Sequence, residues 1–374
     1  MRFNVSGNAL QQQLTAVSKA INSKNALSIL DNFLFRVEGD TLTITGSDQE
    51  NTISGRVEIT ESEQDGAIAV LARHMLNIFK EIGNQPVTFY INEETLEIDI
   101  KFLSGHFNLT GSRAEEYPRQ DEIEADAITI DVPASVLQKG IESTLFATAV
   151  ETIRPVMTGI YLDFHEQDIT FVSSDTHKLV RYINSEIAPG IEHGIILPGK
   201  PANILRSLIG KNDADIRMTI DSKMVRFDFD SLSITSKFIL GSYPNYNRVI
   251  PTDNPFELVV DRASMLNAMR RVSIFASAAS SLVRLNIQPT EVMLSAQDMD
   301  YATSAEERVS CEYKGNPMVI GFNATYLIEV LQNLKSETIV MRLFDPSRPG
   351  LLVPQDEGDG QSTVMLLMPM QVIE

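Results

Sequence analysis

Three times along the chain, a short run in which hydrophobic and polar residues alternate is followed by a longer run with hydrophobic residues at three- and four-residue spacing. The alternation has the period of a half-buried β-strand, and the wider spacing places apolar side chains on one face of an α-helix. The copies begin "RFNVSGNALQQQL" at Arg2, "TIDVPASVLQKGI" at Thr129 and "ELVVDRASMLNAM" at Glu257. Because Val5, Val132 and Val260 take the same place in each copy, the chain repeats itself every 127 or 128 residues.

A second strand-helix unit follows inside each repeat, at residues 68–82, 195–209 and 318–334. Apolar residues again recur at three- and four-residue spacing, as a helix with one buried face requires. The sequence therefore predicts six helices in six equivalent places, at residues 8–24, 72–82, 134–147, 199–211, 262–275 and 323–335.

Between these units the residues alternate with period two and then meet an aspartate: "TLTITGSD", "DITFVSSD" and "EVMLSAQD" end at Asp48, Asp175 and Asp298. A Tyr-Pro pair also repeats, at residues 117–118 and 243–244, where proline ends a strand. We predict an α+β fold of three repeated domains, at residues 1–125, 126–253 and 254–374. Each has two helices packed on antiparallel sheet, and internal repetition of this kind suits a closed ring.

Composition narrows the class of protein. Of the 374 residues 43% are hydrophobic, Cys311 is the single cysteine, and the first residues lack the apolar core of a signal peptide. No run approaches the roughly 20 apolar residues of a membrane span. These features predict a cytoplasmic protein without disulfides.

Charge is distributed unevenly between helices and the rest of the chain. The net charge is −19, yet the six predicted helices carry twelve lysines and arginines against three glutamates. Amphipathic helices that expose lysine and arginine to water would explain this, and so would six helices that face one lumen. With two chains and roughly 8–10 Å between packed helices, twelve helices would enclose a hole about 32–38 Å across. Duplex DNA would pass through it, contacted at its phosphates without regard to sequence.

The segment "SSDTHKLVRY", from Ser173 to Tyr182, places a serine, an aspartate and His177 close together, as a hydrolase would need in space. No G-x-S-x-G elbow occurs, the five histidines show no metal-binding pair, and no Gly-Lys has the spacing of a P-loop. We therefore predict a protein that is not an enzyme and has no cofactor or metal. An acidic scaffold that binds only proteins is the competing hypothesis.

The segments "SDTHKL", "SYPNYNRVIP" and "VMLLMPMQ", at their relative spacing, resemble the DNA polymerase III beta subunit, the bacterial replicative sliding clamp. The resemblance covers the whole chain. It implies a homodimer in which two chains join head to tail in a ring around duplex DNA. It also implies a processivity factor that tethers polymerase subunits, a clamp loader and repair proteins. Their short linear motifs would dock in a hydrophobic cleft between the second and third domains.

The resemblance also implies which residues form the cleft. They are Met157, Ser174, Thr176, His177, Lys178, Leu179, Pro244, Arg248, Val249, Leu366, Leu367, Met368, Pro369, Met370 and Val372. Methionines beside a proline-broken strand end suit varied ligands, although the same tail could be an ordinary strand that fills the core of the third domain. The family often has glycine and arginine where this chain has Thr176 and Lys178, and arginine in place of Gln371, so partner preference should differ.

Two further sets of residues follow from the resemblance. The implied DNA contacts are Lys24, Arg73, Arg154 and Lys200. The implied dimer seam consists of Phe107 and Leu109 in the first domain and Ile274 and Phe275 in the third. Core packing is the alternative for these four, above all for Leu109 and Ile274.

Overall fold

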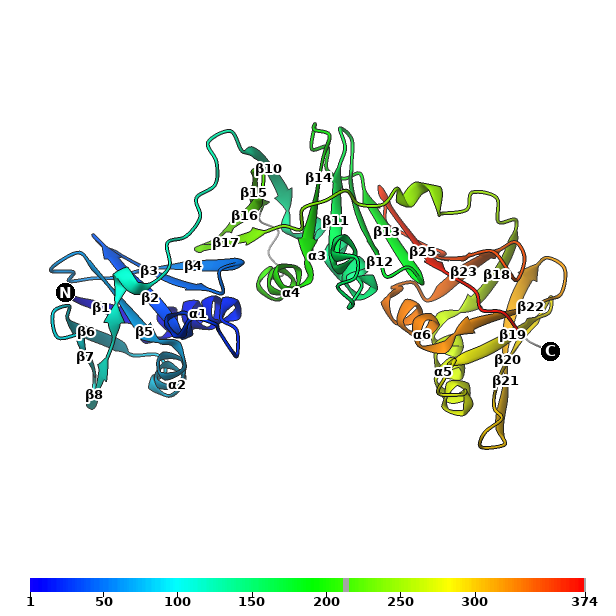
Figure 1. Ribbon diagram of the computed structural model, residues 1–374, viewed down its shortest axis with the longest axis horizontal. Helices are drawn as coiled ribbons and strands as arrows, with labels where there is room; N and C mark the ends of the chain where they lie inside the picture. The colour runs from blue at the N-terminus through cyan, green and yellow to red at the C-terminus, as the bar shows by residue number, and fades with distance from the viewer. Residues whose placement is uncertain (211–214, 373–374) are drawn as a thin grey trace. The chain divides into compact units, whose positions relative to one another are not determined.

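The computed structural model describes residues 1–210 and 215–372 (Figure 1). The chain divides into two units, one of Met1–Ala134 with Ser207–Phe238 and the other of Ser135–Arg206 with Ile239–Glu374. The second repeat is thus shared between the units. Its helices α3 (Ala134–Thr144) and α4 (Gly199–Leu208) contain the points of division.

The first unit has two sheets. The smaller is formed in spatial order by β1 (Arg2–Ser6), β6 (Pro86–Asn92), β7 (Glu97–Phe102) and β8 (Gly105–Thr110). The larger is formed by β10 (Ile128–Pro133), β15 (Asp215–Ile220), β16 (Met224–Phe229), β17 (Leu232–Lys237), β4 (Asn51–Glu58), β3 (Thr41–Ser47), β2 (Asn32–Glu38), β5 (Gly66–Leu71) and β9 (Ser112–Arg113). The pairing of β4 with β17, for example Ile53 opposite Ile234, joins the first repeat to half of the second.

Helices α1 (Gly7–Val17) and α2 (Ala72–Ile82) belong to this unit. The Phe89 ring of β6 contacts three other buried phenylalanines: Phe3 of β1 at 4.8 Å, Phe79 of α2 at 6.0 Å and Phe35 of β2 at 6.2 Å between ring centroids. Aromatic pairs at these separations add to the free energy of burial. This cluster therefore ties both sheets and α2 into one core.

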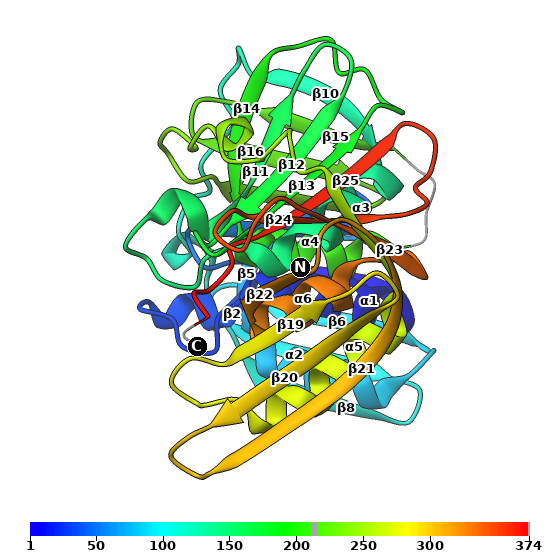
Figure 2. The same cartoon turned by 90° about the vertical axis from the view of Figure 1, so that its right-hand side faces the viewer.

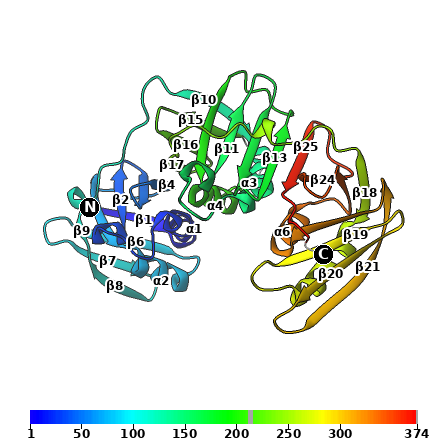
Figure 3. The ribbon, with the colours of Figure 1, turned by 45° about the vertical axis from the view of Figure 1, so that its right-hand side comes forward.

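The second unit has one antiparallel sheet (Figure 3). Its spatial order is β14 (His193–Pro198), β11 (Gly159–Phe164), β12 (Ile169–Ser174), β13 (Lys178–Asn184), β25 (Gln361–Leu367), β24 (Gly350–Pro354), β23 (Thr338–Leu343), β18 (Phe256–Asp261), β21 (Thr303–Lys314), β20 (Glu291–Asp298), β19 (Leu282–Ile287) and β22 (Met318–Asn323). The pairing of β13 with β25 joins the second repeat to the third, as that of β4 with β17 does in the first unit.

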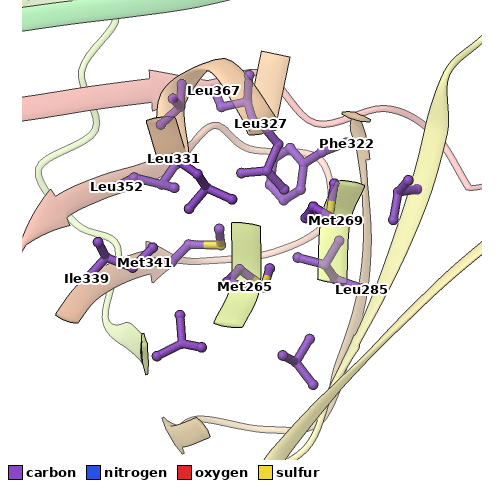
Figure 4. Packing of buried hydrophobic residues seen from close by; sticks show 14 of the residues in the cluster. Met265, Met269, Leu285, Phe322, Leu327, Leu331, Ile339, Met341, Leu352 and Leu367 are labelled. Atoms are coloured by element: carbon purple, nitrogen blue, oxygen red, sulfur yellow. The ribbon is translucent and has the colours of Figure 1, made fainter. Parts of the chain in front are cut away.

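Helix α5 (Arg262–Val272) packs on β20 and β21, which curve across Figure 2, and helix α6 (Ala324–Asn333) packs on α5, β22 and β25. Met265 and Met269 of α5 and Leu327 and Leu331 of α6 point into the core, where they meet Leu367 of β25 (Figure 4). Both helices are capped by the last residue of the preceding strand. Asp261 of β18 accepts a hydrogen bond from the backbone N–H of Ser264 at 2.7 Å, and Asn323 of β22 accepts one from that of Thr325 at 2.9 Å. Such caps let a strand turn into a helix without a loop.

The structure confirms the α+β class and the six helices in their predicted order. The helix predicted at residues 72–82 is α2, whereas the one predicted at 8–24 ends at Val17, followed by a 3₁₀ turn at Ser18–Ala20. Ile21 is extended there, so Lys24 lies in a loop and not in the helix. Lys211, at the end of the fourth predicted helix, lies outside the described residues. No helix in the described part of the chain is long and apolar enough to cross a membrane.

Candidate functional site

The turn that joins β12 to β13 is built around Asp175. Its Oδ1 atom accepts hydrogen bonds from the backbone N–H groups of His177 and Lys178, both at 2.9 Å. Ser174 Oγ donates to the carbonyl of Lys178 at 2.8 Å. An aspartate that binds the backbone two and three residues ahead is typical of a tight turn. Ser174, Asp175 and His177 therefore belong to a turn and do not form a hydrolytic triad.

Thr176 occupies the left-handed region of backbone conformation in this turn, with φ of 79°. A β-branched residue rarely adopts this conformation because its side chain crowds the backbone, whereas glycine does so freely. Thr176 therefore carries backbone strain at the edge of the site, which a glycine at this position would not.

Lys178 is buried under the turn, with 4% of its surface exposed. Its Nζ atom donates to Asp175 Oδ2 at 2.6 Å, forms an ion pair with Glu329 Oε2 of α6 at 2.9 Å, and lies 4.6 Å from the centre of the Tyr326 ring. Burial lowers the pKa of this ammonium, but the hydrogen bonds and charges of Asp175 and Glu329 outweigh burial and raise it. Lys178 is thus committed to holding the turn against α6.

His177 is exposed beside Lys178, and its ring stacks on that of Tyr326, with 5.3 Å between centroids and 16° between planes. Its carbonyl accepts a hydrogen bond from the backbone N–H of Met368 at 3.0 Å. The turn therefore contacts helix α6 through the His177 ring and the C-terminal tail through the His177 carbonyl.

An apolar floor lies next to this turn. Leu179 of β13 stands opposite Leu366 of β25, which stands opposite Leu351 of β24. Tyr246 and Val172 complete the buried cluster, which Tyr161, Tyr243, Ile250 and Val364 flank. Burial raises the pKa of Tyr243 and Tyr246, so both phenols stay neutral over the physiological range.

The rim of the floor exposes further apolar groups. Val249 is 53% and Met368 42% exposed, and Pro244 and Arg248 also lie at the surface. Pro369 follows β25, which ends at Leu367, and the backbone N–H of Met370 then bonds to the carbonyl of Gly321 at 2.8 Å. The rim is thus open to solvent and held at both sides by main-chain bonds.

The predicted cleft residues divide between this site and the core. Leu367 is fully buried in the core of the third repeat, since it faces the opposite side of β25 from Leu366. Met157 is also buried, in the 3₁₀ turn Pro155–Thr158, and Val372 approaches Gly321. For Leu367, the alternative of an ordinary core strand describes its position.

Tyr326 and Glu329 were not predicted from the sequence. They lie one turn apart on α6. Their i,i+3 spacing places an aromatic and an acidic side chain on the same helix face, and this was the only sequence pattern that could have pointed to them. Nothing in the sequence indicated that this helix face would meet the turn at Asp175, because the two segments are some 150 residues apart.

The predicted DNA-contacting residues are spread over both units. Lys24 lies in the loop after α1 and Arg73 in the first turn of α2, while Arg154 precedes the turn at Pro155 and Lys200 is the second residue of α4. The first three are exposed, and no carboxylate forms an ion pair with them within residues 1–210 and 215–372. Their charges are available to an anionic partner.

The predicted seam residues lie at surfaces. Phe107 and Leu109 are half-buried on β8, the edge strand of the four-stranded sheet, and Phe107 stacks on Phe102 at 5.2 Å between centroids. Ile274 and Phe275, in the 3₁₀ turn after α5, are 76% and 38% exposed. Ile274 therefore does not pack in the core.

Comparison with protein families covers all three repeats. The DNA polymerase III beta subunit models match with the N-terminal domain at residues 1–121, the central domain at 131–245 and the C-terminal domain at 247–371. The fold and the site thus define a sliding clamp, and the chain belongs to the DNA polymerase III beta subunit family. Membership of this family confirms that the protein is non-catalytic.

Individual relatives agree over the full length. The "Beta sliding clamp" of Pseudomonas putida is 28% identical over 374 residues, and all of both chains is covered. That of Bacillus subtilis is 26% identical, with 99% of this chain and all of the relative covered. A crystal structure of the Pseudomonas aeruginosa clamp bound to griselimycin has a TM-score of 0.93 and 27% identity, with both chains fully covered.

Proposed function

We propose that two copies of this chain join head to tail into a ring around duplex DNA, and that the surface around Leu179, Leu366 and Met368 docks short linear motifs of partner proteins. The partners would be polymerase subunits, a clamp loader and repair proteins, and the protein would act in the cytoplasm. The domains would be residues 1–125, 126–253 and 254–374. The match to all three beta-subunit domains is the observation that carries this proposal.

The proposed docking site is supported by the combination of a buried apolar floor with a rim that is open to solvent. A buried leucine floor offers apolar area to an inserted side chain, while Met368, with its unbranched and adaptable side chain, borders it. We propose that Thr176, His177, Pro244, Arg248, Val249, Pro369, Met370 and Val372 contribute to the rim and that Ser174 and Lys178 hold it in place. Structures of related clamps with griselimycin support a peptide-binding site in the family.

The DNA contacts at Lys24, Arg73 and Arg154 are supported by exposed charges that form no ion pair with a carboxylate within residues 1–210 and 215–372. Lys24, Arg73, Arg154 and Lys200 would bind phosphates and carry no sequence preference. Reversing the charge of Lys24 and Arg73 together to glutamate should weaken retention on nicked circular DNA at low salt. The matched control reverses Arg36 and Arg308, which are also exposed but are not among the predicted contacts.

The dimer seam is supported by an open strand edge. β8 has a neighbour on one side only, so its other backbone groups are free to pair with another strand. Ile274 and Phe275 would supply apolar area to the same contact. Phe107→Asp or Phe275→Asp should yield monomers in sedimentation, and a dimer that persists in both variants would contradict this seam.

Topology provides the decisive test. A ring should be retained on nicked circular DNA and should slide off when the DNA is linearised, whereas an ordinary DNA-binding protein would stay on the linear form. A scaffold that binds only proteins would show no retention on either DNA.

A further inference from the structure

A hollow of about 650 Å³ lies beside the apolar floor, within the second unit. We call it the Arg181 hollow, and its walls include Arg181, Asn247, Ile250, Arg342, Leu351 and Val364. Leu351 belongs both to this lining and to the buried cluster that contains Leu179 and Leu366, and Ile250 and Val364 pack against that cluster. The hollow and the floor are therefore one continuous surface.

Arg181 brings an uncompensated positive charge to this surface. Its Nη1 atom donates to Asn247 Oδ1 at 3.2 Å, and its Nε atom is covered by protein but has no acceptor. In the described part of the chain no carboxylate forms an ion pair with Arg181. A half-buried guanidinium with spare donors is a strong recognition site for a carboxylate.

The second arginine of the hollow is only partly compensated. Arg342 Nε lies 3.3 Å from Glu257 Oε1, and both side chains remain 40% or more exposed. Glu257 is the single acidic residue of the lining, against two arginines. On a chain with a net charge of −19 this leaves a local positive surplus, which would draw an acidic group to the hollow and away from the rest of the surface.

Strand register fixes the distance between hollow and floor. Arg181 stands opposite Val364, two residues along β13 and β25 from the Leu179–Leu366 pair. Alternate residues share a face and are separated by about 7 Å. A peptide that fills the floor and continues in extended form would thus reach Arg181 within two to four residues.

We propose that the Arg181 hollow binds an aspartate or glutamate of the partner segment, two to four residues from the apolar residue that fills the floor. The carboxylate accepts hydrogen bonds from the guanidinium of Arg181, with Arg342 adding attraction at longer range. The proposal rests on the docking function proposed above and specifies part of its preference.

The test selects ligands without assuming their sequence. A random decapeptide library is bound to the full-length protein, and peptides are eluted with griselimycin so that only ligands of the floor are recovered. We expect acidic residues to be enriched two to four positions from an apolar residue. The enrichment should disappear with Arg181→Gln and persist with Arg348→Gln, whose guanidinium pairs with Asp253 and is not part of the lining.

The size of the preference is measured by comparing the affinity of one selected peptide with that of a copy in which glutamine replaces the acidic residue. The acidic form should bind the native protein about tenfold more tightly, as expected of one charge-assisted contact. With Arg181→Gln the two should bind equally, while griselimycin affinity stays unchanged. If Arg181→Gln does not fold, Arg342→Gln serves instead and should reduce the preference.

The outcomes separate the two proposals. Absence of any griselimycin-eluted peptide would overturn the docking function itself. Peptides without acidic enrichment, or an enrichment that persists in both arginine variants, would overturn only the role of the Arg181 hollow.

Discussion

The junction of the first two repeats and the junction of the last two share a backbone design but differ in surface chemistry. Asp48 and Asp175 end equivalent strands, and each binds the backbone N–H groups two and three residues ahead. Gln49 and Thr176 follow them with nearly equal positive φ, 75° and 79°. In both junctions a tyrosine, Tyr117 or Tyr243, has a buried phenol oxygen without a hydrogen bond of normal geometry.

The two junctions differ in the side chains of one row of residues that pair with each other across four neighbouring strands. In the second junction the row runs Ser174, Leu179, Leu366 and Leu351 across four strands. In the first it runs Ser47, Thr52, Thr235 and Arg226. Three leucines thus correspond to two threonines and an arginine. The first junction has a hollow of about 340 Å³, but its lining is mostly polar and offers no apolar floor.

This difference shows that the fold provides two equivalent frames and that a few outward-facing positions decide which of them has an apolar floor. Hydroxyl groups such as those of Thr45 and Ser54, 3.0 Å apart, satisfy one another and leave little apolar area to bury. Function lies in the site and not in the frame.

Replacing leucines of the apolar floor with threonine should have the largest effect of the predicted changes. Leu179→Thr with Leu366→Thr gives the second junction the residues of the first and should weaken griselimycin binding by at least about 100-fold, because two buried apolar contacts are lost. Each substitution should also lower the free energy of unfolding by about 2–4 kcal/mol. Thr52→Leu with Thr235→Leu is the matched control and should leave griselimycin binding unchanged. Isothermal titration and urea unfolding measure both, and near-native affinity in the first variant would contradict the assignment.

Removing a carboxylate partner of the buried Lys178 ammonium should have the second-largest effect. Asn51, which binds Asp48, holds the place of Lys178 in the first junction. Removing the carboxylate with Glu329→Ala leaves Lys178 with one acidic partner and should lower the free energy of unfolding by about 2 kcal/mol. Adding Lys178→Asn should recover most of that loss, because the buried ammonium is then gone and an asparagine can bind Asp175 as Asn51 binds Asp48. Urea unfolding of the single and double variants checks this, and additive losses would argue against the pair.

Turn strain should separate the junctions by a smaller amount. Thr176→Gly should raise the free energy of unfolding by about 0.5–1 kcal/mol, since glycine relieves the crowding of a β-branched residue at positive φ. Gln49→Gly should change it less, because glutamine is not branched at Cβ. Thermal unfolding of the two variants provides the comparison. Equal effects would mean that strain at Thr176 is not special.

The smallest effect depends on pH. Arg36 pairs with Glu38 in the first junction, whereas the corresponding Asp163 and His165 pair in the second, at 3.4 Å. Burial lowers the pKa of His165, but its hydrogen bond with Glu192 and the charge of Asp163 outweigh burial and raise it above 6.5. The stabilisation is therefore complete below pH 6.5 and is lost as pH rises through the raised pKa. His165→Gln should destabilise by under about 1 kcal/mol at pH 5.5 and by nothing at pH 8.5. Glu38→Gln should show no such dependence between these pH values.

Local pattern predicted much of the fold. The residues of α2 and the strand-ending aspartates follow directly from hydrophobic spacing and turn chemistry, which act over a few residues. The first helix was predicted too long because apolar Ile21 continued the pattern while the backbone had already turned extended. Segment ends depend on local bonds that periodicity does not encode.

The sequence by itself determined the three repeats, the alternation of strand and helix, and the family, because each depends on residues close in the chain or on its repeat period. Tertiary structure alone decided that Leu366 forms part of the apolar floor while Leu367 fills the core, and that Lys178 is enclosed by Asp175 and Glu329. It also decided that Arg181 borders the floor and that no carboxylate among residues 1–210 and 215–372 forms an ion pair with it. The reason is physical: the face of a strand that is buried, and the neutralisation of a charge, depend on which distant segments pack against it.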